Sequence, residues 1–198
     1  MTALATAPVS AETDATRSVL VAGRTGLVAA ALWLLLAAES VVRGGSHEYR
    51  DILWMAPWVG TVAMLALVYR AQRSRLRAWG RLSFLLVGIT MTLVLVGQLG
   101  SLLDNDAMLV FYFPLGPVLW LLSMVPAGIA TVRAGVVPRR VGVLIAAFEV
   151  ISMATGVALS PVFGLDGGGD YSSIGIGKGL VVLAIALSLL AGRRRGSR

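Results

Sequence analysis

The chain has 198 residues, of which 57% are hydrophobic and only 14% are charged, and its mean hydropathy is +0.84. Soluble domains contain about 45–50% apolar and about 25% charged residues, so this composition indicates a membrane protein. Because cysteine is absent, disulfides, thiolate metal sites and cysteine nucleophiles are excluded.

The charge is strongly basic, with a formal net charge of +7 and sixteen arginines against a single lysine. The arginines lie almost entirely in loops and tails beside apolar segments. This position indicates membrane topology and contact with anionic lipids at the arginine loops, rather than nucleic-acid binding. The preference for arginine, in a background rich in Ala, Gly, Val and Leu, favours a bacterial source with a high-GC genome. We therefore expect a multi-pass protein of the bacterial plasma membrane.

The chain begins with a polar segment and continues as six apolar runs. Residues 1–18 lack the basic start of a signal peptide, and we expect them to form a disordered cytoplasmic tail. Each apolar run is close to the ~20 residues that a helix needs to cross hydrocarbon. The runs cover residues 25–42, 52–69, 82–103, 108–132, 141–163 and 172–191, within a membrane domain of residues 19–192 that is followed by a basic tail at 193–198. The predicted fold is all-α, a bundle of six transmembrane helices.

The loop charges predict the orientation of this bundle. The loop between the second and third runs carries five arginines and no acidic residue. In a six-span arrangement fourteen of the sixteen arginines fall on one side. Short loops rich in Lys and Arg stay in the cytoplasm, so both termini are predicted to be cytoplasmic. Aromatic residues gather near the opposite edge and predict an interfacial belt there, formed by Tyr49, Trp54, Trp58, Phe111, Tyr112, Phe113, Phe163 and Tyr171.

Glu149 is the deepest charged residue in the predicted spans. It lies eight residues into the fifth run, which corresponds to about 12 Å at the rise of a helix. No basic residue is expected at its depth, so we expect a protonated carboxyl that donates a hydrogen bond. Ser152 and Thr155 follow on a polar stripe. Two interpretations remain open, a proton or cation site and a neutral, hydrogen-bonded carboxyl of the core.

Three other polar residues share a depth nearer the outer edge, namely Glu39, Gln98 and Lys178. Lys178 lies six residues past Ser172, or about 9 Å from that edge. If the first, third and sixth helices adjoin, Glu39 and Lys178 can form an ion pair with Gln98 as a hydrogen-bond partner. Alternatively, both charged side chains extend to the interface, or the pair only holds the helices together.

Prolines and glycines predict irregular or close packing in two spans. The fourth run contains Pro114, Pro117 and Pro126, which predict kinks. Gly175 and Gly179 form a GxxxG pattern at the start of the sixth run, and such a pattern favours close contact between helices.

The outer loops contain two further candidates, which we interpret as structural. The glycine-rich loop at residues 166–170 lacks the alternating oxygen ligands of a calcium loop, so we expect a flexible turn. His47 is expected to be an exposed surface residue. With one histidine and no cysteine, no metal site or cofactor is predicted.

The segment from Arg133 to Gly142 reads RAGVVPRRVG. It resembles a linker that recurs in small uncharacterised multi-span membrane proteins of high-GC Gram-positive bacteria, with a pattern of roughly R-x-G, two apolar residues, P-R-x-x-G. The resemblance covers mainly residues 108–191. It implies a turn between two late helices and assigns no reaction, substrate or residue role.

Two classes of function remain, and an intramembrane enzyme comes third because no nucleophile–base set or metal ligands are present. The first class is a small-molecule or ion binding or transport component that uses Glu39, Gln98, Glu149 and Lys178. The chain is similar in size to substrate-binding subunits of energy-coupling-factor transporters, although it lacks their specific motifs. The second class is a non-catalytic partner or regulatory subunit of another membrane protein, or a homo-oligomer, with the GxxxG pattern as its docking face. A cavity that reaches Glu149 or Lys178 would favour the first class, and a filled bundle would favour the second.

Overall fold

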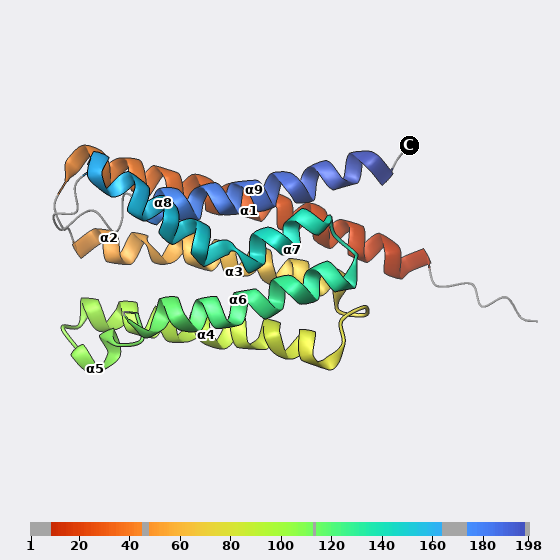
Figure 1. Ribbon diagram of the computed structural model, residues 1–198, viewed down its shortest axis with the longest axis horizontal. Coiled ribbons are helices and arrows are strands. Elements are labelled where there is room, and N and C mark those ends of the chain that lie inside the picture. Colours follow the sequence, from red (N-terminus) through yellow and green to blue (C-terminus); the bar gives the residue numbers. More distant parts are fainter. Residues whose placement is uncertain (1–8, 45–47, 113, 164–173, 197–198) are drawn as a thin grey trace, which may run out of the picture.

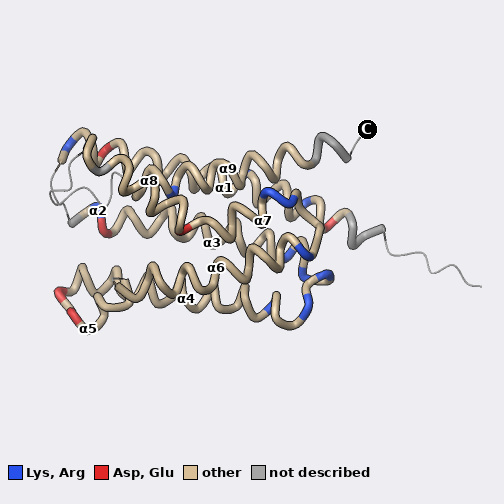
Figure 2. Tube along the Cα trace, viewed as in Figure 1, with Lys and Arg blue, Asp and Glu red and all other residues tan. Residues whose placement is uncertain are grey.

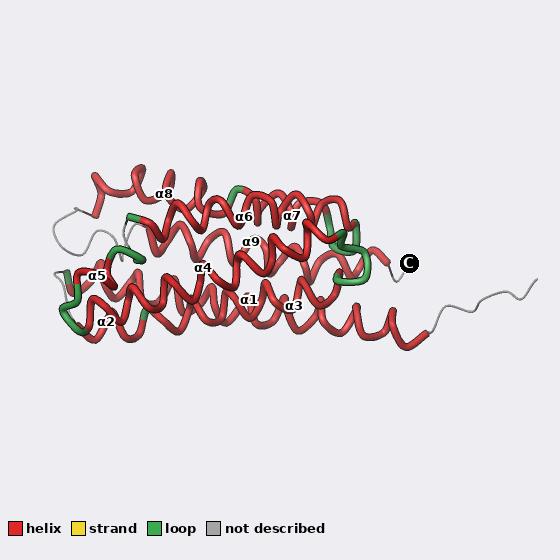
Figure 3. Tube along the Cα trace, turned by 90° about the horizontal axis from the view of Figure 1, so that it is seen from below, coloured by secondary structure: helices red, strands yellow, loops and turns green. Residues whose placement is uncertain are grey.

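The computed structural model describes residues 9–44, 48–112, 114–163 and 174–196. Within these ranges the chain forms helices joined by turns, without a strand. The longer helices run side by side along one axis, and the connecting loops lie mainly at the two ends (Figures 1 and 3). The helices are α1 (Val9–Arg43), α2 (Glu48–Leu53), α3 (Met55–Gln72), α4 (Ala78–Leu102), α5 (Asp106–Leu109), α6 (Leu115–Ala134), α7 (Arg139–Ala146), α8 (Phe148–Phe163) and α9 (Gly175–Gly196).

The helices have the length and the surface of membrane spans. Five helical units are long and apolar enough to cross a membrane, and the bent pair α7–α8 makes a sixth if it counts as one span. Large apolar side chains such as Leu35, Val118 and Val157 point outward and are more than half exposed. Water disfavours such a surface, whereas the acyl chains of a bilayer solvate it. The predicted all-helical architecture is therefore confirmed, with five or six helices that can span a membrane.

The first and last helices of the chain pack against each other. Helix α1 packs against α9 and α3, α6 packs against α4 and α7, and α8 packs against α9. Both ends of the described chain lie at the same end of the bundle (Figure 1). Figure 2 shows that most of the basic residues gather at this end, whereas the acidic residues around α5 lie at the other.

Several helix boundaries differ from those predicted. Helix α1 begins at Val9 and so includes residues 9–18, which we expected to be disordered. The fourth span starts only at Leu115, because the chain first forms the short helix α5. The side chain of Asn105 caps α5 by accepting a hydrogen bond from the Met108 N–H at 3.2 Å. Hydropathy cannot detect such a capped turn within an apolar run.

The prolines of the fourth span begin a helix and do not break one. Pro114 is the N-cap residue of α6, and Pro117 lies in its first turn, where backbone N–H groups have no partner within a helix. Pro126 lies inside α6, which nevertheless counts as one continuous span. The prolines therefore do not divide this span into two helices.

The break occurs in the fifth span, which we predicted as one helix at residues 141–163. Helices α7 and α8 meet at an angle of 60° around Ala147, part-way along the bundle (Figure 3). Before the bend the chain packs closely on α6, because a Cβ at Gly128 would collide with the backbone of Gly142 and Ala146. After the bend α8 packs against α9. At the bend, the main packing partner of the fifth span therefore changes from α6 to α9.

The linker between α6 and α7 has the conformation of a sharp turn. Gly135 ends α6 with a φ of 65°, a left-handed conformation that favours glycine. Pro138 precedes the first residue of α7 and has an extended ψ of 136°. These two residues account for the turn that the Arg133–Gly142 pattern implies.

Four tryptophans and a phenylalanine form a continuous aromatic core. Trp33 contacts Trp54 and Trp58, Trp58 contacts Trp120, and Trp120 contacts Phe148, with ring centroids 4.7 to 5.9 Å apart and near-perpendicular planes. Trp54 and Trp58 are only 3% and 5% exposed, so our assignment of both to an interfacial belt is wrong. Their spacing of four residues places them on one helix face, which here points inward.

The glycines of the GxxxG pattern face the interior of the protein. A Cβ at Gly175 would lie 2.5 Å from the ring of Trp54, and one at Gly179 would lie 2.8 Å from Leu34 on α1. These glycines therefore allow the close approach of α9 to α1. Because α1 and Trp54 already cover this surface, it is not an exposed docking face.

Candidate functional site

Glu149 and Lys178 form an ion pair inside the bundle. The Lys178 Nζ lies 3.5 Å from the Glu149 Oε2, and the side chains are only 7% and 6% exposed. The same ammonium donates a hydrogen bond to the Ser152 Oγ at 3.3 Å. It also lies 5.2 Å from the centre of the Trp58 ring, within the range of a cation–π interaction. The lysine therefore has three partners from two neighbouring helices.

The bend between α7 and α8 places Glu149 opposite this lysine. Glu149 is the second residue of α8, directly after the bend at Ala147. Helix α9 approaches α8 closely, because a Cβ at Gly177 would lie only 2.6 Å from the Ser152 carbonyl oxygen. This contact brings the neighbouring Lys178 within reach of Ser152 and Glu149.

Two expectations about Glu149 are corrected by this arrangement. We expected no basic residue at its depth, but the side chain of Lys178 extends to it instead of reaching toward the outer interface. The carboxyl is therefore not alone at its depth, because it has a cationic partner. The predicted polar stripe is present in part: Ser152 is fully buried beside Lys178, whereas the Thr155 hydroxyl donates to the Ile151 carbonyl of its own helix.

Glu39 has partners other than the predicted Lys178. Its carboxylate accepts hydrogen bonds from the Arg50 guanidinium, with Nε 2.8 Å from Oε2, and from the Tyr49 hydroxyl. Arg43, one turn later on α1, adds a contact of 3.6 Å. Arg50 is 1% exposed, so these groups form a charged cluster that joins α1 to α2. Helices α1 and α9 do adjoin, but Glu39 and Lys178 point to different neighbours.

Gln98 does not join either cluster. The side chain is 1% exposed, and neither atom of its amide makes a hydrogen bond within the described part of the chain. Val94, one turn earlier on α4, lies in the wall of the central cavity described next. Of the four predicted site residues, the structure brings together only Glu149 and Lys178.

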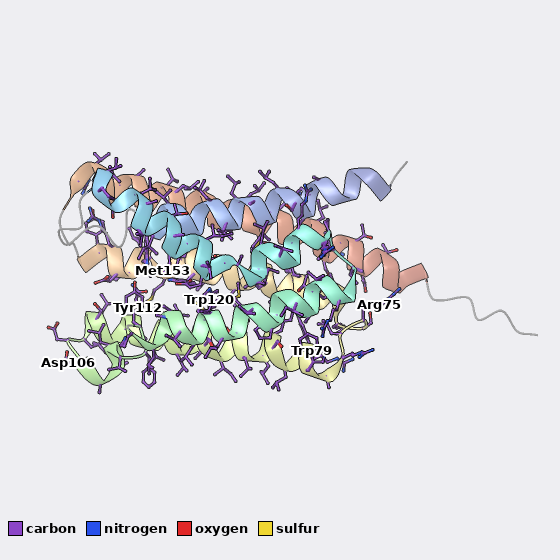
Figure 4. The ribbon with its side chains drawn as sticks, in the orientation of Figure 1. Arg75, Trp79, Asp106, Tyr112, Trp120 and Met153 are labelled. Atoms are coloured by element: carbon purple, nitrogen blue, oxygen red, sulfur yellow. The ribbon has the colours of Figure 1, made fainter. Side chains whose placement is uncertain are left out.

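A cavity of about 280 Å³ reaches the Glu149–Lys178 pair. Its wall comes from α3, α4, α6, α8 and α9 and is mainly aromatic and apolar. In Figure 4 Met153, Tyr112 and Trp120 lie near one another between α8 and α6. The lining residues are Trp54, Trp58, Val94, Tyr112, Gly116, Pro117, Trp120, Glu149, Met153, Ile174 and Lys178.

Three lining residues carry buried polar atoms without a hydrogen bond to the described residues. These atoms are the indole nitrogens of Trp58 and Trp120 and the Glu149 Oε2, whose contact with Lys178 is an ion pair without hydrogen-bond geometry. Buried polar atoms normally have partners. The sequence predicts Trp58 at the interface and does not single out Trp120 or Met153. The four-residue spacing of Trp54 and Trp58 was the available signal of an inward face.

The described residues contain no group of three or more His, Cys, Asp or Glu side chains that could hold a metal ion. The loop at residues 166–170 and His47 lie outside the described residues. The site thus consists of a buried lysine–carboxylate pair at the wall of an aromatic cavity. Comparison of the chain with protein-family models, with curated proteins and with solved structures found no match, so the resemblance of the Arg133–Gly142 linker stays a prediction.

Proposed function

We propose that this protein binds or transports a small molecule, and that the central cavity is its binding site. The observation that carries the proposal is a cavity of about 280 Å³ that ends on the buried Glu149–Lys178 pair. A chain that used its polar groups only to hold helices together would fill this space with side chains. Ionisable groups inside membrane spans are costly, and they commonly mark pathways for substrates or ions.

The wall of the cavity favours a small amphipathic ligand. Indole rings from Trp54, Trp58 and Trp120 supply a large apolar and aromatic surface. The volume lies just below the range of about 300–1,000 Å³ that holds drug-sized molecules. A ligand with an apolar or aromatic body and one hydrogen-bonding or charged group fits both the wall and the ion pair.

We further propose that the basic end of the bundle faces the cytoplasm and that the membrane is the bacterial plasma membrane. The support is the positive charge at one end of the bundle. Short loops rich in Lys and Arg stay on the cytoplasmic side of the membrane. A thiol added after Arg198 should resist an impermeant maleimide in intact cells and react after lysis. Labelling in intact cells would contradict this orientation.

The alternative function, a partner subunit that docks through its GxxxG pattern, has less support. Gly175 and Gly179 pack against Trp54 and α1 of the same chain, so this surface is not free for a partner. A regulatory role would require another surface, and none of the predicted polar residues lies on an exposed docking face.

The binding proposal can be tested with a pair of tryptophan substitutions. Met153 lines the cavity and is 41% exposed, so the indole of Met153→Trp can narrow the cavity without overpacking the buried core. Leu122 on α6 is 64% exposed and lies away from the cavity wall, so Leu122→Trp is the matched control. Purified protein would be titrated with a panel of small aromatic and aliphatic carboxylates and amines, and binding would be followed by thermal stabilisation.

We expect at least one compound of the panel to stabilise the wild type and the Leu122→Trp variant. The apparent affinity of the Met153→Trp variant for this compound should be lower by about tenfold or more, which corresponds to a loss of about 1.4 kcal/mol in binding free energy. If no compound of the panel binds, or if binding survives in Met153→Trp, the central cavity is not the binding site.

A further inference from the structure

A second cavity, of about 440 Å³, lies at the basic end of the bundle. Arg75 and Arg77 from the α3–α4 loop and Arg133 from the last turn of α6 contribute to its wall. Trp79 stands beside them, with the Arg133 guanidinium 5.3 Å from the centre of its ring. Figure 4 shows Arg75 and Trp79 at this end of the molecule. Neither Glu149 nor Lys178 lines this cavity, which is distinct from the central site.

The three arginines are not neutralised within the described part of the chain. The ion pairs found there involve Glu39 with Arg43 and Arg50, and Glu149 with Lys178. Arg75, Arg77 and Arg133 are exposed, and no described carboxylate lies within 4 Å of their nitrogens. Guanidinium groups bind phosphate oxygens with paired, charge-assisted hydrogen bonds. The chemistry that complements this cavity is therefore a phosphate group.

Apolar surface continues from the cavity along α4 and α6 toward the middle of the bundle. Leu82 and Leu86 follow Trp79 at helical spacing and are 54% and 42% exposed. On α6, Ile129 lies one turn before Arg133 and is 41% exposed. Since α4 and α6 pack against each other, these side chains can support acyl chains directly beneath a headgroup. A soluble phosphate would make no use of this surface.

We propose that this arginine cavity is a specific binding site for the phosphate headgroup of an anionic phospholipid. The phosphate lies among Arg75, Arg77 and Arg133, the headgroup contacts Trp79, and the acyl chains lie along the exposed apolar residues of α4 and α6. Basic pockets between membrane helices bind anionic headgroups by the same chemistry. The proposal does not depend on the function proposed for the central cavity.

The test compares two arginines that line the cavity with two that do not. The double variant Arg75→Gln/Arg133→Gln removes two charges from the cavity wall. The matched control, Arg70→Gln/Arg73→Gln, removes two charges from the same end of the bundle but from outside the wall. Delipidated protein in a neutral detergent would be titrated with phosphatidylglycerol, phosphatidylcholine and free glycerol phosphate, and bound molecules would be counted by native mass spectrometry.

We expect the wild type to bind one phosphatidylglycerol at least tenfold more tightly than phosphatidylcholine. The cavity variant should lose this preference, and the control variant should change the affinity by less than threefold. Equal weakening in both variants would show that diffuse charge attracts the lipid and would overturn the proposal. Glycerol phosphate that binds as tightly as the lipid would identify a soluble phosphate as the ligand and would also overturn it. Thermal unfolding of each variant distinguishes loss of the site from loss of the fold.

Discussion

Glu149 and Lys178 place opposite charges side by side in a segment that is long and apolar enough to lie in a membrane. Removing two charges from water is costly, and their attraction offsets this cost only when the partners stay together. Trp58 and Ser152 add contacts to the lysine. The protein is therefore expected to lose stability when either residue loses its partner, and this loss can be measured.

Single and double substitutions of the pair should not have additive effects. Glu149→Gln or Lys178→Met alone leaves one buried charge without its partner and should lower the free energy of unfolding by about 3–5 kcal/mol. The double variant carries no buried charge at this site, so it should be more stable than the worse of the two single variants. Thermal or chemical unfolding in detergent measures the three values. Additive losses would show that the two side chains act independently.

The sequence identifies Glu149 as a candidate site residue but does not identify its partner. Glu149 was identified because a carboxylate deep in an apolar run is conspicuous in any membrane sequence. Its partner was not identified, because depth along a helix axis says nothing about which neighbour a side chain faces. Lys178 was paired with Glu39 by depth alone, whereas Glu39 contacts Arg50, only eleven residues away.

At the scale of helices, the close crossing of α6 and α7 precedes the bend that positions Glu149. Gly128 and Gly142 allow two backbones to touch, and α8 then departs at 60° to pack against α9. The two halves of the fifth span thus pack mainly against different neighbours, α7 against α6 and α8 against α9. Hydropathy predicts that this span exists, but both halves are apolar, so no property of residues 141–163 indicated the bend.

The crossing predicts opposite effects for two identical substitutions. Gly128→Ala would bring a methyl group into the backbone of Gly142 and Ala146, and such overpacking costs about 1–3 kcal/mol or more. Gly88→Ala, inside α4, meets no atom within 4 Å and should be neutral or slightly stabilising, because alanine is the better helix former. Thermal unfolding of both variants checks the difference. A Gly128→Ala variant as stable as Gly88→Ala would contradict the described crossing.

At the scale of the whole molecule, charge and hydropathy together predicted most of the architecture. The apolar runs located the helices, and most of the arginines that Figure 2 marks gather at one end of the bundle. The two cavities could not be predicted in the same way. Each is a space between side chains of helices that are distant in sequence, such as Val94, Trp120 and Lys178 in the central site. Apolar patterning places such residues inside the bundle without showing where they leave room.

If the central cavity is a binding site, water and small polar molecules must reach the space beside Glu149 and Lys178. Because the natural chain contains no cysteine, a single introduced thiol reports on one position. Val94→Cys places the thiol at a position of the cavity wall that is only 3% exposed, and Leu122→Cys places it on the outer surface of α6, where the residue is 64% exposed. Both proteins would be reconstituted in lipid nanodiscs, where both faces are accessible, and treated with a negatively charged thiol reagent.

Thiols react as thiolates, which do not form in contact with acyl chains. A wet cavity predicts that Val94→Cys reacts at least about tenfold faster than Leu122→Cys, a difference of about 1.4 kcal/mol in activation free energy. A ligand found for the central site should slow this reaction. Equally slow labelling of both variants would contradict the claim, because it would mean that the cavity is dry and that the buried ion pair only holds α8 against α9.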